Sequence, residues 1–427
     1  MKKWVLTSFI LLAGIAVVLA TAGRKNESIP QETVEAEPVR LNTTLTNSLS
    51  EYEELRGLDS QILAYMKKWE LKGASLAIMR NDSLIYAKGY GWADEEAGDT
   101  LAPGHIMRVG SVSKLITATA IMQLQERGML SLQDTVFGPR GILDDSLYTA
   151  SIRDRRIYGI TVEQLLRHKG GFTCGLGDPM FSTRNIIRDF RLDCAPDSRT
   201  LVSCVLQRRL GFTPGTSQTY SNFGYLLLSL IIERISGISY ADFVQENVLL
   251  PAHCYDMHIA GNFYEDRRSN EVRYYMQQGA EPSETYDMRE GLVERCYGGS
   301  DITALQGAGA WCASPAELCR FVAAIDGKDG IPDIITKESV EAMTEYFDPE
   351  TYSLGWNDTK PTGEWTRTGT LAGSTALIKC YPDGECWIML TNTGTYRGPY
   401  FSKHTSTLFR KCREAYSASL PHRNLFE

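Results

Sequence analysis

The sequence lacks several features that would point to particular classes of protein. Its 427 residues contain no block of five or more Lys and Arg, and 44 basic against 52 acidic residues give a net charge of −8. Nucleic-acid binding leaves a basic patch or stripe, so we expect no nucleic acid as partner. The 6 histidines are scattered without metal-ligand spacing. We therefore expect no metal, and no other cofactor is indicated.

Three further features are absent, and each absence excludes a type of fold or chain organisation. A Gly-x-Ser-x-Gly string does not occur, which excludes a nucleophile elbow of the α/β-hydrolase type. No apolar run beyond the amino terminus is long enough to span a bilayer. There is neither an internal repeat nor a low-complexity array, and 43% hydrophobic with 22% charged residues is an ordinary globular composition. The length suits a few domains or one large two-lobed enzyme.

The amino terminus has the pattern of an export signal. Lys2 and Lys3 precede an apolar run over residues 4–19, and Ala20-Thr21-Ala22 has the small-x-small pattern of a cleavage site. We predict that residues 1–22 are a signal peptide and that the mature protein lies in the bacterial periplasm or outside the cell, with no stable membrane span. The alternative is an uncleaved helix that tethers the protein to the membrane.

The remaining chain is predicted to form one domain after a linker. Residues 23–50 are rich in Glu, Pro, Asn, Thr and Ser, which is typical of a flexible linker. The folded domain is expected over 51–427. Strand patterns at its two ends and helical patterns between them predict an α/β (α+β) fold. In this fold an antiparallel sheet flanked by helices is built from both termini, about 51–108 and 305–427, and an all-helical lobe of about 109–304 is inserted.

The hydrophobic periodicity predicts individual elements within this domain. A strand, a turn and a partner strand are expected over 74–88, and further strands over 354–393. Glycines that end helices support two of the helix predictions. Helices are expected over 55–69, from Met107 to Gly128, over 223–236 before Gly237, from Trp311 onward and over 401–415.

The 10 cysteines matter because an exported chain meets oxidising conditions. Cys380 and Cys386 flank Pro382-Asp383-Gly384, a turn sequence between two apolar runs. A hairpin there would place the two sulfur atoms opposite each other. Either a disulfide between Cys380 and Cys386 or two buried thiols would fit this arrangement.

One pair of residues carries a candidate chemistry. Ser111 and Lys114 are three residues apart at a predicted helix start, so their side chains share one face. A lysine whose pKa is lowered by burial or a neighbouring cation can deprotonate the serine. The helix amino terminus also favours the negative charge that develops during acyl transfer. Alone, the pattern is weak, because about one or two chance matches are expected in a chain of this length.

Two further motifs follow in order, Tyr220-Ser221-Asn222 and Arg367-Thr368-Gly369. With them the chain resembles the serine β-lactamase and penicillin-binding protein superfamily, most closely the branch of class C β-lactamases, related esterases and D-amino-acid peptidases. The resemblance covers about residues 55–415 and implies the β-lactamase/transpeptidase-like fold. Other stretches that resemble family landmarks are residues 87–94, 108–110, 165–168 and 307–311.

The resemblance implies roles for these residues. Ser111 would attack a carbonyl carbon, Lys114 would be the general base, and Tyr220 would pass a proton to the leaving group. The backbone amides of Ser111 and Thr370 would form the oxyanion hole. The implied substrate-binding residues are Asn222, Arg367, Thr368 and Gly369.

Arg367 departs from the family pattern, which has Lys or His at this position. Its cation would lower the pKa of Lys114 or Tyr220, and its fork could hold a substrate carboxylate. A guanidinium does not donate and recover a proton as histidine does, so a proton relay through it is not expected. His168, at the end of an apolar helix, is interpreted as a structural histidine.

The predicted function is that of an exported serine hydrolase that forms an acyl-enzyme on Ser111. Its substrate would be an ester, an amide, a D-amino-acid peptide or a β-lactam, with a cell-wall peptide among the candidates. A class A β-lactamase is not expected, because residues 254–263 contain no glutamate. The alternative is a non-turnover penicillin-binding or β-lactam-sensing module, which would share the same motifs.

Overall fold

The computed structural model describes residues 40–173, 175, 177–348 and 351–427. The predicted signal peptide, residues 1–22, and the linker up to residue 39 lie outside the described residues. Within the described part of the chain, no helix is both long and apolar enough to cross a bilayer.

The end of the expected linker is folded. Residues 40–50 form α1 (Leu41–Thr44) and a 3₁₀ helix, η1 (Asn47–Ser50). The side-chain amide of Asn42 donates to the carboxylates of Asp256 and Glu317, each at 2.9 Å. The polar composition of residues 40–50 therefore does not mean that this segment is solvated. Its polar side chains form hydrogen bonds with the rest of the domain.

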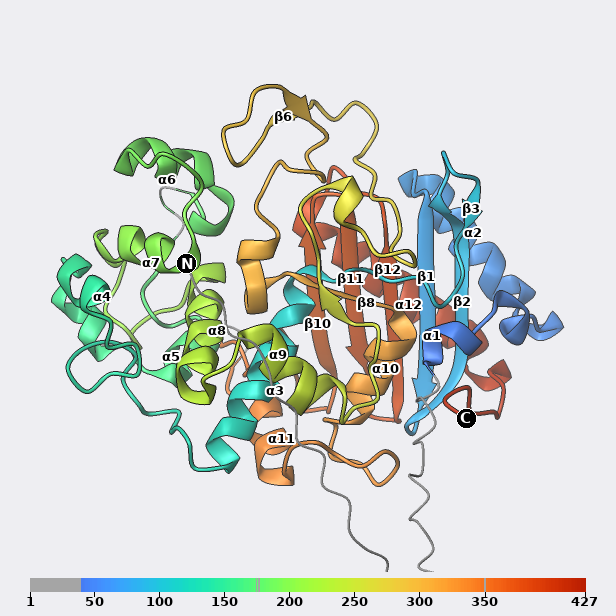
Figure 1. Ribbon diagram of the computed structural model, residues 1–427. Coiled ribbons are helices and arrows are strands. Elements are labelled where there is room, and N and C mark those ends of the chain that lie inside the picture. Colours follow the sequence, from blue (N-terminus) through green and yellow to red (C-terminus); the bar gives the residue numbers. More distant parts are fainter. Residues whose placement is uncertain (1–39, 174, 176, 349–350) are drawn as a thin grey trace, which may run out of the picture. The chain divides into compact units, whose positions relative to one another are not determined.

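The centre of the fold is a seven-stranded antiparallel sheet in the order β3-β2-β1-β12-β11-β10-β9 (Figure 1). Strand β1, from the beginning of the domain, pairs with β12, from its end, with Ala74 opposite Thr391 and Arg80 opposite Glu385. The predicted sheet built from both termini is thus confirmed. Its strands are β1 (Gly73–Arg80), β2 (Ser83–Asp94), β3 (Asp99–Thr100), β9 (Asp358–Thr359), β10 (Trp365–Leu371), β11 (Ser374–Cys380) and β12 (Glu385–Thr391).

One face of the sheet is covered by α2 (Arg56–Trp69) and α12 (Phe401–Tyr416). Successive residues of a strand point to opposite faces, and β1 follows this rule. Leu76 and Ile78 pack in the cluster under α2 and α12, whereas Ala77 belongs to the larger cluster on the other face. Both faces of the sheet are therefore buried, which explains why every residue of β1 before Arg80 is buried.

The larger cluster lies between the sheet and the helices of the middle of the chain. Figure 1 shows this helical region beside the sheet, with α4, α5, α6 and α7 farthest from it. Helix α3 is buried along most of its length, and α8 packs against it. The α-helices of this side are α3 (Ser113–Glu126), α4 (Ser146–Ser151), α5 (Val162–Leu166), α6 (Thr183–Phe190), α7 (Ser198–Leu206), α8 (Asn222–Ser236), α9 (Tyr240–Val244), α10 (Pro315–Ala323) and α11 (Lys337–Thr344).

The inserted region also contains short strands and single helical turns. A three-stranded sheet has the order β4-β8-β5, formed by Met107–Arg108, Trp311–Ala313 and His258–Ile259. A separate pair is formed by β6 (Ser283–Glu284) and β7 (Leu292–Val293). The short 3₁₀ or π turns include η2 (Glu53–Leu55), η3 (Gly110–Val112), η4 (Arg155–Gly159), η5 (Pro179–Phe181), η6 (Gln245–Leu249), η7 (Tyr264–Asp266), η8 (Thr303–Ala308), η9 (Gly398–Tyr400) and η10 (Ser417–Ser419).

Two of the helix predictions begin too early. Met107 and Arg108 form β4, and the residues from Trp311 to Ala313 form β8, because these two short strands pair with each other. The following helix α10 starts only after Ser314, whose hydroxyl accepts a hydrogen bond from the backbone of Glu317 at 3.0 Å. An apolar run directly before such a cap belongs to the preceding strand.

The predicted hairpin around the cysteine pair is present. Cys380 in β11 lies directly opposite Cys386 in β12, and the two sulfur atoms are 2.8 Å apart. Both side chains are buried and are thiols in this structure. The sequence-based placement is confirmed, and the disulfide bond itself stays a prediction.

Candidate active site

The predicted nucleophile lies where a turn runs into a helix. Ser111 is the middle residue of η3, which continues directly into α3. Strand β10 passes close to it. A Cβ atom on Gly369 would overlap the carbonyl oxygen of Val109, and one on Gly110, whose φ is +53°, would lie 2.8 Å from the backbone nitrogen of Thr370. The two glycines therefore allow the backbone of β10 to approach the serine segment closely.

Lys114 is buried one turn after Ser111. Its Nζ atom lies 3.2 Å from Ser111 Oγ and 2.6 Å from Asn222 Oδ1, and it also contacts the carbonyl oxygen of Ala308. A neutral amine has two N–H groups and one lone pair. If the oxygens of Asn222 and Ala308 accept those two hydrogens, the lone pair is directed at the hydroxyl of Ser111.

The surroundings of Lys114 favour this neutral form. Burial is the largest cause that lowers its pKa well below the ordinary value, and the positive charge of Arg367 lowers it further. The carboxylate of Asp178 acts in the opposite direction. Desolvation and a neighbouring cation are the two effects that convert a lysine into a base near neutral pH.

Tyr220 contacts the same serine from the other side. Its hydroxyl donates to Ser111 Oγ at 2.6 Å, and its ring lies 4.8 Å from the Nζ atom of Lys114. The ring of His168 packs against Tyr220 at 4.4 Å, and Nδ1 of His168 accepts a hydrogen bond from the backbone of Ser221 at 3.2 Å. Burial lowers the pKa of His168 well below its usual value. The neutral ring of His168 therefore positions Tyr220. This role agrees with the interpretation of His168 as a structural histidine.

Asn222 is oriented by a residue that the sequence analysis missed. Ser221 rather than Asn222 caps helix α8, because its hydroxyl accepts from the backbone of Gly224. The amide of Asn222 is thus free to donate to Asp178 at 2.6 Å, which directs its oxygen at Lys114. Asp178 also caps η5 through the backbone of Met180. Of these two roles of Asp178, only the capping of η5 could have been predicted from the sequence.

Arg367 does not occupy the predicted position in the substrate cleft. It is fully buried, and its Nε and Nη2 atoms donate to the carbonyl oxygen of Ser111, with Nε at 2.7 Å. The expectation that its fork would hold a substrate carboxylate is therefore wrong, because the guanidinium lies behind the nucleophile. Arg367 was also predicted to lower the pKa of Lys114, and the direction of the pKa shift agrees with this prediction.

A cavity of about 370 Å³ opens in front of Ser111. The backbone amide and the hydroxyl of Thr368 donate to Asn357 Oδ1, at 2.7 and 3.1 Å, and both residues belong to its wall. Lys114 and Arg367 lie behind the wall and do not line it. The predicted site residues that line the cavity are Ser111, Tyr220, Asn222, Thr368, Gly369 and Thr370.

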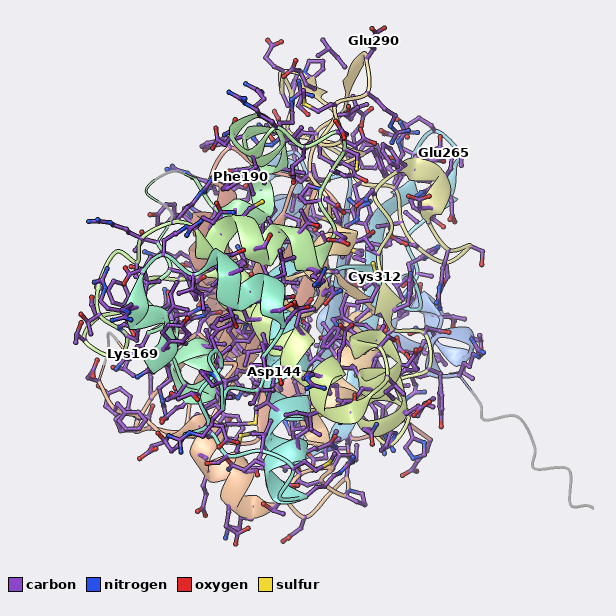
Figure 2. All side chains as sticks on the ribbon, turned by 60° about the vertical axis from the view of Figure 1, so that its left-hand side comes forward. Asp144, Lys169, Phe190, Glu265, Glu290 and Cys312 are labelled. Atoms are coloured by element: carbon purple, nitrogen blue, oxygen red, sulfur yellow. The ribbon has the colours of Figure 1, made fainter. Side chains whose placement is uncertain are left out.

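One cluster of possible metal ligands lies elsewhere in the described residues. His258, Glu271 and Cys312, the last labelled in Figure 2, place one ligand atom each within 4.8 Å of one another, and all three are buried. Burial opposes the ionisation of Glu271, but the hydroxyl of Tyr274 donates to its carboxylate at 2.7 Å and the positive charge of Arg108 is close, and the pKa of Glu271 is held below the usual value. The carboxylate of Glu271 therefore already has a neighbouring cation, Arg108.

Comparison with known proteins identifies the family. The family model described as Beta-lactamase matches residues 58–406. Penicillin-binding protein 4* of Bacillus subtilis is 28% identical over 299 residues, which cover 68% of this chain and 60% of that protein. The putative penicillin-binding protein PbpX of Bacillus subtilis is 26% identical over 342 residues, or 79% of this chain and 75% of that protein. The chain thus spans about three-fifths of the length of the first of these relatives.

Solved structures share the fold. The D-amino acid amidase from Ochrobactrum anthropi SV3 superposes with a TM-score of 0.66 at 18% identity, covering 86% of this chain and 100% of that one. FmtA from Staphylococcus aureus gives a TM-score of 0.63 at 18% identity, covering 90% and 95%. At these identities the likeness shows the fold alone. Because the family model matches well over half of its length, the chain belongs to the Beta-lactamase family.

Proposed function

We propose that this protein forms an acyl-enzyme on Ser111 and releases the acyl group to water. One observation carries the proposal. Ser111 Oγ is within hydrogen-bonding distance of both Lys114 Nζ, at 3.2 Å, and Tyr220 Oη, at 2.6 Å, and it faces a cavity of about 370 Å³. A hydroxyl between a buried amine and a phenol has one group to take its proton and another to give a proton to the leaving group.

The proposed acylation follows from this arrangement. Neutral Lys114 accepts the proton of Ser111 as Oγ bonds to the substrate carbonyl carbon. The carbonyl oxygen becomes an oxyanion, which the backbone amides of Ser111 and Thr370 stabilise. When the intermediate collapses, the bond to the leaving group breaks and Tyr220 supplies the proton, which Lys114 restores. In deacylation, water takes the place of the leaving group and the same steps run in reverse order.

The substrate class proposed is an ester, amide or β-lactam with an uncharged reacting centre. Among the described residues, the cavity in front of Ser111 is lined by no formally charged side chain. Penicillin-binding proteins and a D-amino acid amidase are among the similar proteins, which supports D-amino-acid amides, a cell-wall peptide or β-lactams as candidates. We also propose that the mature protein acts outside the cytoplasm, on the basis of residues 1–22. A non-turnover penicillin-binding module is the second candidate, since it would use the same nucleophile.

Mass spectrometry tests the nucleophile and the outcome together. The protein is incubated with a fluorophosphonate, with benzylpenicillin and with a phenyl ester, and its intact mass is followed over time. We expect each adduct, after digestion, to map to the peptide that contains Ser111. A penicillin adduct that persists favours the binding module, and one that disappears while the drug is consumed favours a β-lactamase. A fluorophosphonate adduct on any other residue would refute the assignment of Ser111.

A pair of substitutions tests whether neutral Lys114 is the base. Activity requires the unprotonated amine, so it appears above the pKa of Lys114 and is lost as the pH falls through it. Arg367→Gln removes a cation that lowers this pKa, so the acid limb of kcat/KM should move to higher pH. Asp178→Asn removes a carboxylate that raises it, so the limb should move to lower pH.

Arg367→Lys, which keeps the positive charge, is the matched control and should leave the limb close to its wild-type position. Melting temperatures recorded for all three variants identify any loss of folding. Shifts of both charge-removing variants in the same direction would show that the limb does not report Lys114.

A further inference from the structure

A second cavity continues from the cavity in front of Ser111. Its volume is about 320 Å³, and the two cavities share four wall residues, Phe181, Thr370, Leu371 and Pro399. Thr370 therefore lies at the junction, and it is also the residue whose amide is proposed for the oxyanion hole. A substrate with its carbonyl group at Ser111 would reach both cavities at once.

The second cavity contains an unpaired positive charge. Among the described residues that line the two cavities, Arg295 is the only one with a formal charge. Its side chain is exposed and forms no hydrogen bond or ion pair with any described residue. Arginines nearby in the chain are paired, since Arg273 contacts Glu96 and Arg289 contacts Asp287. A guanidinium left without a carboxylate in the wall of a cleft is suited to receive one from a ligand.

The backbone next to Arg295 is held in place from two sides. The carbonyl oxygen of Cys296 accepts a hydrogen bond of 2.6 Å from Nη1 of Arg108, which lies three positions before the nucleophile. The side chain of Cys296 packs on Gly373, which has a φ of +81° and where an added Cβ would lie 2.9 Å from Cys296 Cβ. These two contacts of Cys296 hold the backbone next to Arg295 against the segments that contain Ser111 and Thr370.

We propose that the second cavity binds an anionic group on the acyl half of the substrate and that Arg295 determines this specificity. This inference rests on the proposed function. The leaving group must lie within reach of the proton donor Tyr220, which lines only the first cavity. The acyl half therefore continues past Thr370 toward Arg295. Arg367 is buried and does not compete for this group.

The test compares substrates that differ only in this charge. The 4-nitrophenyl half-esters of adipic, pimelic and suberic acids carry a carboxylate at the far end of the acyl chain, and their methyl-capped counterparts do not. We expect wild-type kcat/KM to favour at least one free acid over its capped form. Arg295→Gln should reduce this preference about tenfold or more while the capped esters react as before. Arg295→Glu should reverse it, and added salt should weaken it in the wild type.

Arg289→Gln is the matched control, because Arg289 lies in the loop between β6 and β7, close in the chain to Arg295, is paired with Asp287 and lines neither cavity. Its neighbour Glu290 marks the outer tip of that loop in Figure 2. This variant should keep the wild-type preference. If the wild type prefers no free acid, or if Arg295→Gln keeps the preference, the inference is overturned while hydrolysis that depends on Ser111 still stands. If neither ester reacts faster than with Ser111→Ala, the proposed function fails and the inference falls with it.

Discussion

The Ser111→Ala variant is expected to lose at least about 10⁴-fold in kcat/KM on a phenyl ester, because the substitution removes the hydroxyl that is proposed to form the acyl-enzyme. The fold should be retained. The hydroxyl of Ser111 lies between Lys114 and Tyr220, but Lys114 keeps its hydrogen bonds to Asn222 and Ala308 when that hydroxyl is removed. No buried donor is left without an acceptor on the lysine side, so the melting temperature should stay close to that of the wild type.

The neighbouring serine provides the control for this experiment. Ser113 is buried two residues later, and its hydroxyl accepts a hydrogen bond from the backbone of Trp311 at 3.1 Å. Ser113→Ala should therefore cost stability, about 1 kcal/mol or more, and leave the chemistry intact. If Ser111→Ala retained wild-type turnover, or if both serine variants lost activity equally, the assignment of the nucleophile would have to be abandoned.

Replacing Lys114 by methionine should lower the rate of acylation by about 10²- to 10⁴-fold, the range typical of a lost general base. Methionine is unbranched and fills much of the same buried space. It leaves the oxygens of Asn222 and Ala308 without their donor, a cost of about 1–3 kcal/mol for each unsatisfied group. It also removes the cost of burying an amine. The measurement is the rate at which the fluorophosphonate adduct forms under single-turnover conditions.

The stability of the same variant has a characteristic pH dependence. The pKa of Lys114 is depressed in the folded protein, so between that value and the ordinary 10.5 the unfolded chain binds a proton that the folded protein does not. The free energy of unfolding of the wild type should therefore gain from this residue as the pH rises through that window. Lys114→Met loses this gain. Its stability relative to the wild type should thus fall as the pH rises, and a constant difference would mean that Lys114 is charged in the fold.

The sequence allowed prediction of those features that depend on short spacing. Ser111 and Lys114 meet because a three-residue interval on a helix brings them to one face. The hairpin that places Cys380 opposite Cys386 was predictable because its turn residues are adjacent in the chain. The family resemblance supplied the order of the distant motifs. Local chemistry and this order together were enough to predict that Ser111 and Lys114 lie side by side and that the central sheet is built from both ends of the domain.

Other features depend on how distant segments pack, which one sequence does not reveal. Asp178 reaches Asn222 only because the turn that carries it lies over the start of helix α8. Arg367 is an ordinary charged strand residue by its sequence, yet its strand passes so close to Ser111 that the guanidinium is buried behind it. Arg295 depends on a loop position fixed by Arg108, from a remote strand. Each of these contacts joins residues that no local pattern connects.

The pairing of β1 with β12 also governs the order in which the protein can fold. The first strand of the domain finds this neighbour only after the entire helical region and the last strands have been synthesised. Closing so long a loop is entropically costly and makes folding slow, and meanwhile one edge of an apolar strand stays open to other chains. Thr370, near the end of β10, is also synthesised late. Assembly of the proposed active site therefore requires that β10 has been synthesised, and an amino-terminal fragment that stops short of β10 lacks part of the proposed site.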